Sequence, residues 1–174
     1  SMPDTRITMA SKPVTPRLQG RRTKIVATLG PASSSPEVIG EMIDSGVNVF
    51  RMNFSHGTHE QHRQNIALVR DQAQQRKRHV AILGDLQGPK IRIGDLQEDV
   101  KVLKSGEELV LTLNESSADS RNNRIHVTYE PLPDSVFAND ILLLDDGRIR
   151  LKVIEVSGSD VRCTVQQPGD LSSR

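Results

Sequence analysis

Cysteine, aromatic residues and long apolar runs are scarce in this sequence, and each scarcity excludes a class of protein. Cys163 is the single cysteine, so an intramolecular disulfide cannot form and a disulfide-stapled secreted domain is excluded. Apolar runs such as Ile141–Leu144 are far shorter than the roughly 20 residues that a membrane-spanning helix needs. We therefore expect a soluble protein with no membrane partner, in a compartment that keeps thiols reduced.

The chain also has no large net charge, because its 174 residues include 23 Lys and Arg and 22 Asp and Glu. This balance gives no reason to expect nucleic acid or a strongly acidic partner. Residues 1–20 are locally basic and contain three prolines, with no apolar periodicity. They predict a disordered leader, and the lack of interleaved aromatic residues favours a solvated segment over a nucleic-acid-binding tail.

After the leader, apolar β-branched runs alternate with amphipathic stretches. They predict strand 24–29, a helix from Pro36 that Gly46 ends, strand 47–50, a helix from Thr58 to about Gln75, and strand 80–83. Thr58 and Gln61 have capping-box spacing. The first run suits a strand buried on both faces. This order, with short connections, predicts a parallel sheet with right-handed crossovers.

From about residue 94 the apolar residues recur with period two, which is typical of half-buried strands. Asp146-Gly147 and Ser157-Gly158 have the composition of hairpin turns. These residues therefore predict an antiparallel β module that follows the third strand.

Polar side chains gather where the second strand ends. Arg51, Asn53 and Ser55 alternate with Met52 and Phe54, so the three polar groups should point to one side of the strand. A guanidinium beside neutral oxygen ligands suits a phosphate together with a cation. The residues alone leave open a second interpretation, in which these groups are solvated at the edge of a sheet.

Four other features of the sequence have a structural and a functional interpretation. His56 stands beside a helix start, where histidine more often caps or donates a hydrogen bond than catalyses. Asp85 and Arg92 flank a third polar loop, which either joins the same rim or is a Gly-Pro turn between solvated charges. Asp145-Asp146-Gly147-Arg148 favours a hairpin turn over a metal site, and Cys163 favours an inert core thiol.

Taken together, four motifs in this order resemble the pyruvate kinase family. They are KIVATLGPAS at 24–33, FRMNFSHG at 50–57, GDLQGPKIR at 84–92 and LDDG at 144–147. The resemblance covers the chain from about residue 21 to its end.

The resemblance implies an α/β fold: a partial TIM (β/α)8 barrel with an inserted small antiparallel β-barrel domain. Residues 21–92 would supply three strands and two helices of the barrel, and residues 93–174 the mobile inserted domain. The activity implied is phosphoryl transfer from phosphoenolpyruvate to ADP, giving pyruvate and ATP, in a cleft between the two parts.

The family's functional positions transfer onto this sequence residue by residue. Arg51 would be the catalytic residue that holds the transferred phosphoryl group, and Arg92 would contact nucleotide phosphate. The nucleotide-contact surface corresponds to Asn53, Phe54, Ser55 and His56. The monovalent-cation positions correspond to Asn53, Ser55, Asp85 and Leu86.

Leu86 and Lys90 depart from the potassium-dependent members, which have a polar residue and a glutamate there. We hypothesise that the Lys90 ammonium replaces the monovalent cation, so that K⁺ is not required.

The chain is much shorter than the family's usual length, and the catalytic lysine, the acidic Mg²⁺ ligands and the threonine near proton transfer are expected outside it. We therefore expect this chain to be an incomplete portion that is inactive alone. The resemblance implies that the intact protein is a cytoplasmic homotetramer. The alternative is a truncated, non-catalytic module that binds nucleotide or anion, or pairs with a partner.

Overall fold

A computed structural model describes residues 24–32, 34–88, 91–98, 100–145 and 147–172, so the predicted leader and Lys90 lie outside the described residues. The helices are α1 (Pro36–Asp44), α2 (His59–Gln75) and α3 (Leu132–Ser135), with 3₁₀ turns at Glu115–Ser117 and Ser120–Asn122. The first five strands are β1 (Val26–Leu29), β2 (Val49–Asn53), β3 (Ala81–Asp85), β4 (Val100–Leu103) and β5 (Glu108–Thr112). The others are β6 (Arg124–His126), β7 (Ile141–Leu144), β8 (Ile149–Ser157), β9 (Asp160–Gln167) and β10 (Gly169–Ser172).

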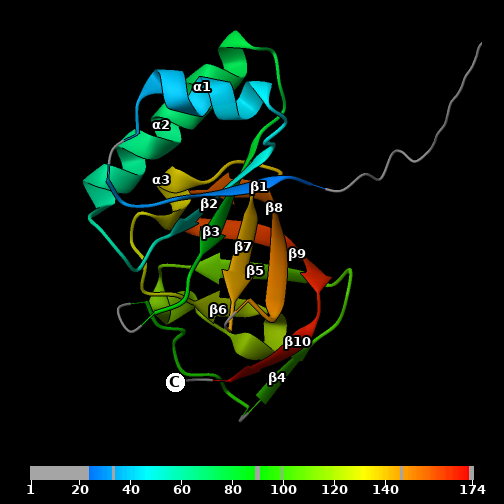
Figure 1. The fold of residues 1–174 in the computed structure, drawn as a ribbon. Helices are drawn as coiled ribbons and strands as arrows, with labels where there is room; N and C mark the ends of the chain where they lie inside the picture. Colours follow the sequence, from blue (N-terminus) through cyan, green and yellow to red (C-terminus); the bar gives the residue numbers. More distant parts are fainter. Residues whose placement is uncertain (1–23, 33, 89–90, 99, 146, 173–174) are drawn as a thin grey trace, which may run out of the picture.

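The first part of the chain folds as the alternating pattern predicts. β1, β2 and β3 pair in parallel, and α1 and α2 lie together on one side of them (Figure 1). Ser35 caps α1 through the amide of Val38, and Thr58 forms the predicted capping box with Gln61. The α/β class is therefore confirmed, and short local signals fix where both helices begin.

The expectation that the first strand is buried on both faces is wrong. Val26 and the preceding Ile25 are each 49% exposed, and only Leu29 of β1 is buried. β1 is an edge strand, which pairs with β2 alone among the described residues. A continuous apolar run is typical of a central strand, but the run does not reveal how many other strands pair with it.

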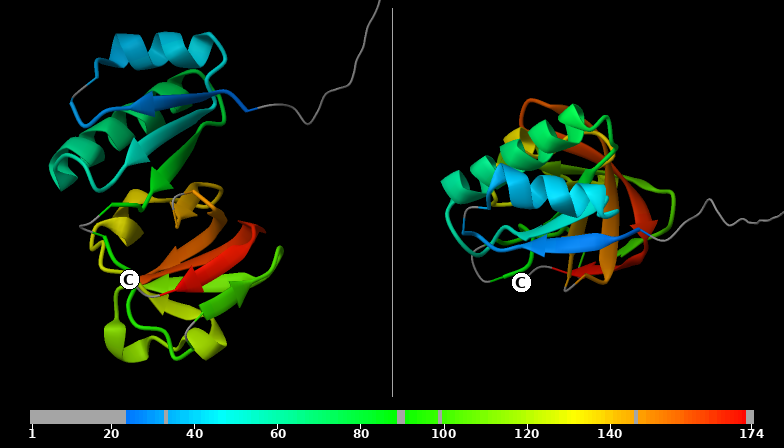
Figure 2. Two further views of the ribbon diagram at one scale, coloured as in Figure 1. Left: turned by 60° about the horizontal axis from the view of Figure 1, so that its bottom comes forward. Right: turned by 45° about the horizontal axis from the view of Figure 1, so that its top comes forward.

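In the described part of the chain, eight strands form one mixed sheet in the order β1-β2-β3-β7-β8-β9-β5-β6, and β4 pairs with β10 separately. The two parts that the predicted boundary near residue 92 separates thus share one sheet, because β7 pairs in parallel with β3. The strands beyond β3 curve away from the helical layer (Figure 2).

The module after residue 93 is antiparallel through β7, β8, β9 and β5, but β5 and β6 are parallel, which the sequence reading did not predict. The two 3₁₀ turns between β5 and β6 carry the chain back, so that both strands run in one direction. The hairpins are confirmed: Asp145 (φ 51°) and Gly147 (φ 79°) lie between β7 and β8, and Gly158 (φ 59°) between β8 and β9.

A hydrophobic core extends from the helical layer into the β module. It includes Phe50 and Ile39 on the helical side and Leu109, Leu151 and Cys163 in the module. Cys163 is fully buried, and burial raises the pKa of its thiol to about 12, as expected for an inert core thiol.

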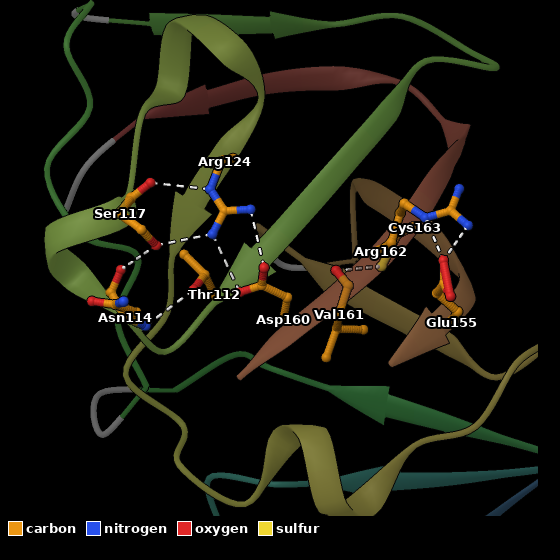
Figure 3. Close-up of polar contacts among 9 residues, drawn as sticks. All are labelled: Thr112, Asn114, Ser117, Arg124, Glu155, Asp160, Val161, Arg162 and Cys163. Carbon is orange, nitrogen blue, oxygen red and sulfur yellow. Dashed lines mark hydrogen bonds and ion pairs between the residues drawn. The ribbon is translucent and has the colours of Figure 1, made fainter. Parts of the chain in front are cut away.

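Arg124 joins β6 to the start of β9. Its guanidinium donates to both carboxylate oxygens of Asp160, at 3.0 and 3.3 Å, and to Ser117 (Figure 3). Burial alone would raise the pKa of Asp160, but hydrogen bonds from Arg124 and Thr112 and the Arg124 charge outweigh it and lower the pKa. Arg162 pairs with Glu155 in the same close-up. These two ion pairs link β9 to β6 and to β8.

Candidate functional site

The pairing of β2 with β3 brings the predicted polar residues to one rim. Arg51 lies opposite Leu83, and Asn53 lies opposite Asp85, in the parallel register. Partners in register share a face of the sheet, and residues two apart on a strand share it as well. Arg51, Asn53 and Asp85 therefore lie on one face, where both strands end.

Arg51 and Asp85 form an ion pair across this rim. The Asp85 side chain is 2% exposed and the Arg51 side chain 42% exposed. The second carboxylate oxygen of Asp85 accepts a hydrogen bond from the Gln87 amide at 3.0 Å. Asp85 is thus a buried, fully engaged carboxylate that fixes one side of the guanidinium and leaves its other donors toward solvent.

The turn after β2 places Ser55 against the loop after β3. Asn53 accepts from the Ser55 amide at 3.0 Å, and the Ser55 hydroxyl donates to the Gln87 carbonyl. Gly88 crosses over Ser55 with φ +120°, and an added Cβ would collide with the serine side chain. Glycine is needed at position 88 for both reasons.

The two apolar residues among the predicted nucleotide and cation positions are buried. Phe54 is 2% exposed and stacks on Tyr129 at 5.0 Å between ring centroids. A Cβ at Gly84 would collide with the Phe54 ring, so the glycine makes room for it. Leu86 is also buried, and its amide donates to the Leu143 carbonyl at 3.0 Å. The side chains at these two positions are thus packed inside the protein.

Arg92 and His56 are exposed, as a ligand contact requires. The main chain of Arg92 pairs with Thr128. The structure thus joins Arg51 to Asp85 by an ion pair and Asn53 to Ser55 by a hydrogen bond.

The sequence analysis missed two buried polar residues on α2 that contact the rim loops. His62 is 2% exposed, and its Nε2 bonds to the His56 carbonyl. Asn65 is fully buried and donates to the carbonyls of Gly30, at 3.1 Å, and Ala32, at 3.4 Å. Their spacing places both on the apolar side of α2 with Ile66, a position where a polar residue signals a buried partner.

The fold and this rim define an α/β protein with an arginine–aspartate pair at the carboxyl ends of parallel strands, the usual ligand side of such sheets. A family model described as pyruvate kinase, barrel domain, matches residues 20–174. The chain belongs to the pyruvate kinase family, as its motifs indicated.

Relatives from distant organisms are similar over most of the chain. Pyruvate kinase II of Salmonella typhimurium is 46% identical over 153 residues, which are 88% of this chain and 32% of that protein. Pyruvate kinase of Thermococcus litoralis is 44% identical over 156 residues, or 90% and 32%.

A crystal structure of a pyruvate kinase from Cryptosporidium parvum matches with 35% identity and a TM-score of 0.44, over 87% of this chain and 31% of that chain. The chain spans about a third of the length of the curated relatives it matches.

Proposed function

We propose that the protein containing this chain transfers a phosphoryl group from phosphoenolpyruvate to ADP, giving pyruvate and ATP. The observation that carries this proposal is the half-exposed Arg51 guanidinium, held by the buried Asp85 where β2 and β3 end. Phosphoryl transfer depends largely on positioning and on positive charge placed against the phosphoryl oxygens. A guanidinium anchored on one side and open on the other meets both needs.

The remaining roles are proposed for the positions that match the family motifs. Arg51 would contact the transferred phosphoryl group, and Arg92 would contact nucleotide phosphate from its exposed position. His56 and the main chain around Phe54 would form part of the nucleotide surface. Asn53 and Ser55 would hold that surface in shape through their own hydrogen bonds.

We also propose that β1, β2 and β3 begin an eight-stranded barrel and that residues 93–174 form an inserted β-barrel domain. The parallel pairing of the first three strands and the antiparallel run from β7 to β5 support this assignment. A barrel strand needs a neighbour on each side. The half-exposed Val26 on β1 marks the edge where a further strand would pair.

At three of the four cation positions the side-chain oxygens are engaged in protein contacts. Asp85 binds Arg51 and the Gln87 amide, Asn53 accepts from Ser55, and the Ser55 hydroxyl donates to a carbonyl. We propose that the activity does not require K⁺ because the Lys90 ammonium replaces the cation, and the departures at Leu86 and Lys90 from the potassium-dependent members are the basis for this proposal.

Turnover of the longer protein with Mg²⁺, in buffer free of potassium and sodium, checks this prediction. We expect the rate to change less than twofold when potassium chloride is added, with tetramethylammonium chloride as the control for ionic strength. Substitution of Lys90 by Glu should create activation by K⁺. A large activation of the unsubstituted protein by K⁺ would refute the prediction.

We propose that Mg²⁺ is held by acidic residues of the longer protein, where it would neutralise phosphate charge. Among the described residues, no group of three or more His, Cys, Asp or Glu side chains lies close enough to hold a metal ion. No helix in the described ranges is long and apolar enough to cross a membrane. A cytoplasmic homotetramer is proposed from the family alone.

A coupled pyruvate assay tests the proposed function. The natural reading frame beyond Arg174 is expressed with this chain, and its intact mass confirms the longer product. Pyruvate formation that depends on phosphoenolpyruvate, ADP and Mg²⁺ is the expected result. A correctly folded longer protein that makes no pyruvate would refute it.

The second candidate is a non-catalytic module that binds nucleotide or anion, or pairs with a partner. The observation that favours pairing is the edge of β1, where Ile25 and Val26 are half exposed. The reading frame and the pyruvate assay separate the two candidates, since a module would bind ADP or a partner without turnover.

A further inference from the structure

The loops that follow β1 and β2 both rest on α2. His62 and Asn65 lie three residues apart on this helix and reach different loops. His62 bonds to the carbonyl of His56 in the loop after β2, and Asn65 bonds to the carbonyls of Gly30 and Ala32 in the loop after β1. One helix therefore holds two neighbouring segments of the rim.

The contact of His62 with the His56 carbonyl determines which ring nitrogen carries the hydrogen. Because a carbonyl can only accept, Nε2 must carry the hydrogen, and the neutral ring then has its lone pair on Nδ1. Nδ1 is buried with no hydrogen-bond partner among the described residues. The ring packs against Phe54 in an edge-to-face arrangement, with 5.5 Å between ring centroids. The ring is thus fixed in one tautomer and one orientation.

Asn65 completes the arrangement on the other loop. Its carbonyl oxygen accepts from the Ser34 amide at 3.5 Å, while its amide group donates to the two carbonyls. The two loops also touch each other, because an added Cβ at Gly57 would collide with Pro31. The loops after β1 and β2 are therefore packed against each other at this point.

We propose that His62 and Asn65 are positioning residues that hold the rim loops in the conformation that receives the nucleotide. This inference rests on the proposed phosphoryl transfer. Neither side chain would touch substrate, because both are buried. They would act through the His56 segment and through the Gly30–Ala32 loop packed against it. Their loss should therefore weaken the binding of ADP more than it weakens the contact between Arg51 and the phosphoryl group.

A purely structural role predicts a different outcome. Losing a buried hydrogen bond destabilises a fold whatever ligand it binds. A positioning role instead predicts that the KM for one substrate changes more than the KM for the other. The separation of KM for ADP from KM for phosphoenolpyruvate distinguishes the two roles.

The first experiment measures both KM values in the longer protein. His62→Leu keeps the apolar volume but removes the donor, and we expect a KM for ADP at least tenfold higher, with the KM for phosphoenolpyruvate and kcat within threefold of the original. His62→Gln restores a donor near the Nε2 position and should remain within threefold throughout. Gln64→Leu changes an exposed residue on the same helix, whose side chain donates, among the described residues, to Glu60 only, and is the matched control.

Asn65→Leu tests the second anchor in the same assay. Because it acts on the nucleotide segment through the Gly30–Ala32 loop, the expected rise in KM for ADP is smaller, about three- to tenfold. Unchanged KM values in both leucine variants, or equal rises for both substrates, would overturn the proposal.

The second experiment uses NMR on the 174-residue chain and does not depend on activity. Nitrogen–proton correlation of the imidazoles should show the Nε2–H tautomer for His62. Amide exchange at His56 and Gly57 should be at least tenfold faster in His62→Leu than in Gln64→Leu.

These readouts separate failure of the proposed function from failure of the inference. A longer protein without turnover would refute the proposed function, and the anchoring would then stand or fall on NMR. An Nδ1–H tautomer in the unsubstituted chain, or unchanged exchange in His62→Leu, would overturn the anchoring even where turnover is present. The tautomer measurement needs no variant, so it decides the matter if His62→Leu does not fold.

Discussion

Single buried polar residues shape the rim more than the exposed charges do. Asp85, His62 and Asn65 are each at most 2% exposed, and each is hydrogen-bonded to a segment of the proposed site. A buried polar group is costly unless it is paired, so these contacts restrict the loops to few conformations. Arg51 gains a fixed direction from Asp85.

His62 gives the fold a predictable dependence on pH. Burial lowers the pKa of His62, the nearby charge of His59 lowers it further, and the bond to the His56 carbonyl opposes the shift. The unfolded chain then binds the proton more tightly than the folded chain. Stability is therefore full above the ordinary imidazole pKa of about 6.5 and is lost as the pH falls toward the lowered value.

Urea unfolding at pH 7.5 and pH 5.5 measures this effect. The free energy of unfolding should fall between these two values by a larger amount in the unsubstituted chain than in His62→Gln. His59→Gln, on the same helix, should retain most of the dependence. Equal losses in the unsubstituted chain and in His62→Gln would contradict the assignment.

At this scale the sequence predicted the face on which polar residues gather but not their partners. The alternation of Arg51, Asn53 and Ser55 is visible in any strand, so their common face was predictable. The contacts of His62 and Asn65 depend on where α2 packs relative to the loops. That position follows from tertiary packing, which no local pattern encodes.

At the scale of elements, local signals decide where the helices begin. In the capping box of α2, Thr58 accepts from the Gln61 amide at 3.1 Å, and Gln61 accepts from the Thr58 amide at 2.8 Å. The same residues begin the helix that carries His62. The start of α2 thus also determines which residue of the loop after β2 lies next to His62.

Thr58→Ala should destabilise the chain by about 1 kcal/mol, because the N-cap acceptor is lost. Thr58→Ser keeps the hydroxyl and should cost a few tenths of that amount. Chemical denaturation with an unchanged m-value is the measurement. A loss below about 0.3 kcal/mol for the alanine variant would mean that the cap adds little here.

Strand pairing was less predictable than helix starts. The parallel order of β1, β2 and β3 follows from crossover helices, which leave few alternatives. The pairing of β7 with β3 and the parallel pairing of β5 with β6 join segments far apart in sequence. Period two reveals that a strand has a buried face, but not which strand lies beside it.

At the scale of the whole chain, Asp140 joins the helical layer to the β module. It is 2% exposed, and it accepts from the Ile82 amide at 2.9 Å and the Phe137 amide at 2.8 Å. Arg70 of α2 pairs with its carboxylate at 2.7 Å and lies over the Phe137 ring, 3.9 Å from the centroid. One buried carboxylate thus ties α2, β3 and the segment before β7 together.

Asp140→Ala should lower the free energy of unfolding by about 3 kcal/mol, because it leaves a largely buried guanidinium and two amides without their acceptor. Asp140→Asn keeps an acceptor oxygen and should lose less. Asp134→Ala, at an exposed position in α3, should change stability by less than about 0.5 kcal/mol. A loss in Asp140→Ala no larger than in Asp134→Ala would contradict this role.

The most direct measurement is kcat/KM for phosphoenolpyruvate in the longer protein carrying Arg51→Gln. Removal of one fixed donor to a developing oxyanion costs about 10²- to 10³-fold, and we predict a loss in this range. The matched control is Arg63→Gln, at an exposed arginine of α2 that pairs with Glu60, and it should stay within twofold. If Arg51→Gln keeps more than a third of the original kcat/KM, the phosphoryl group is not held at this rim.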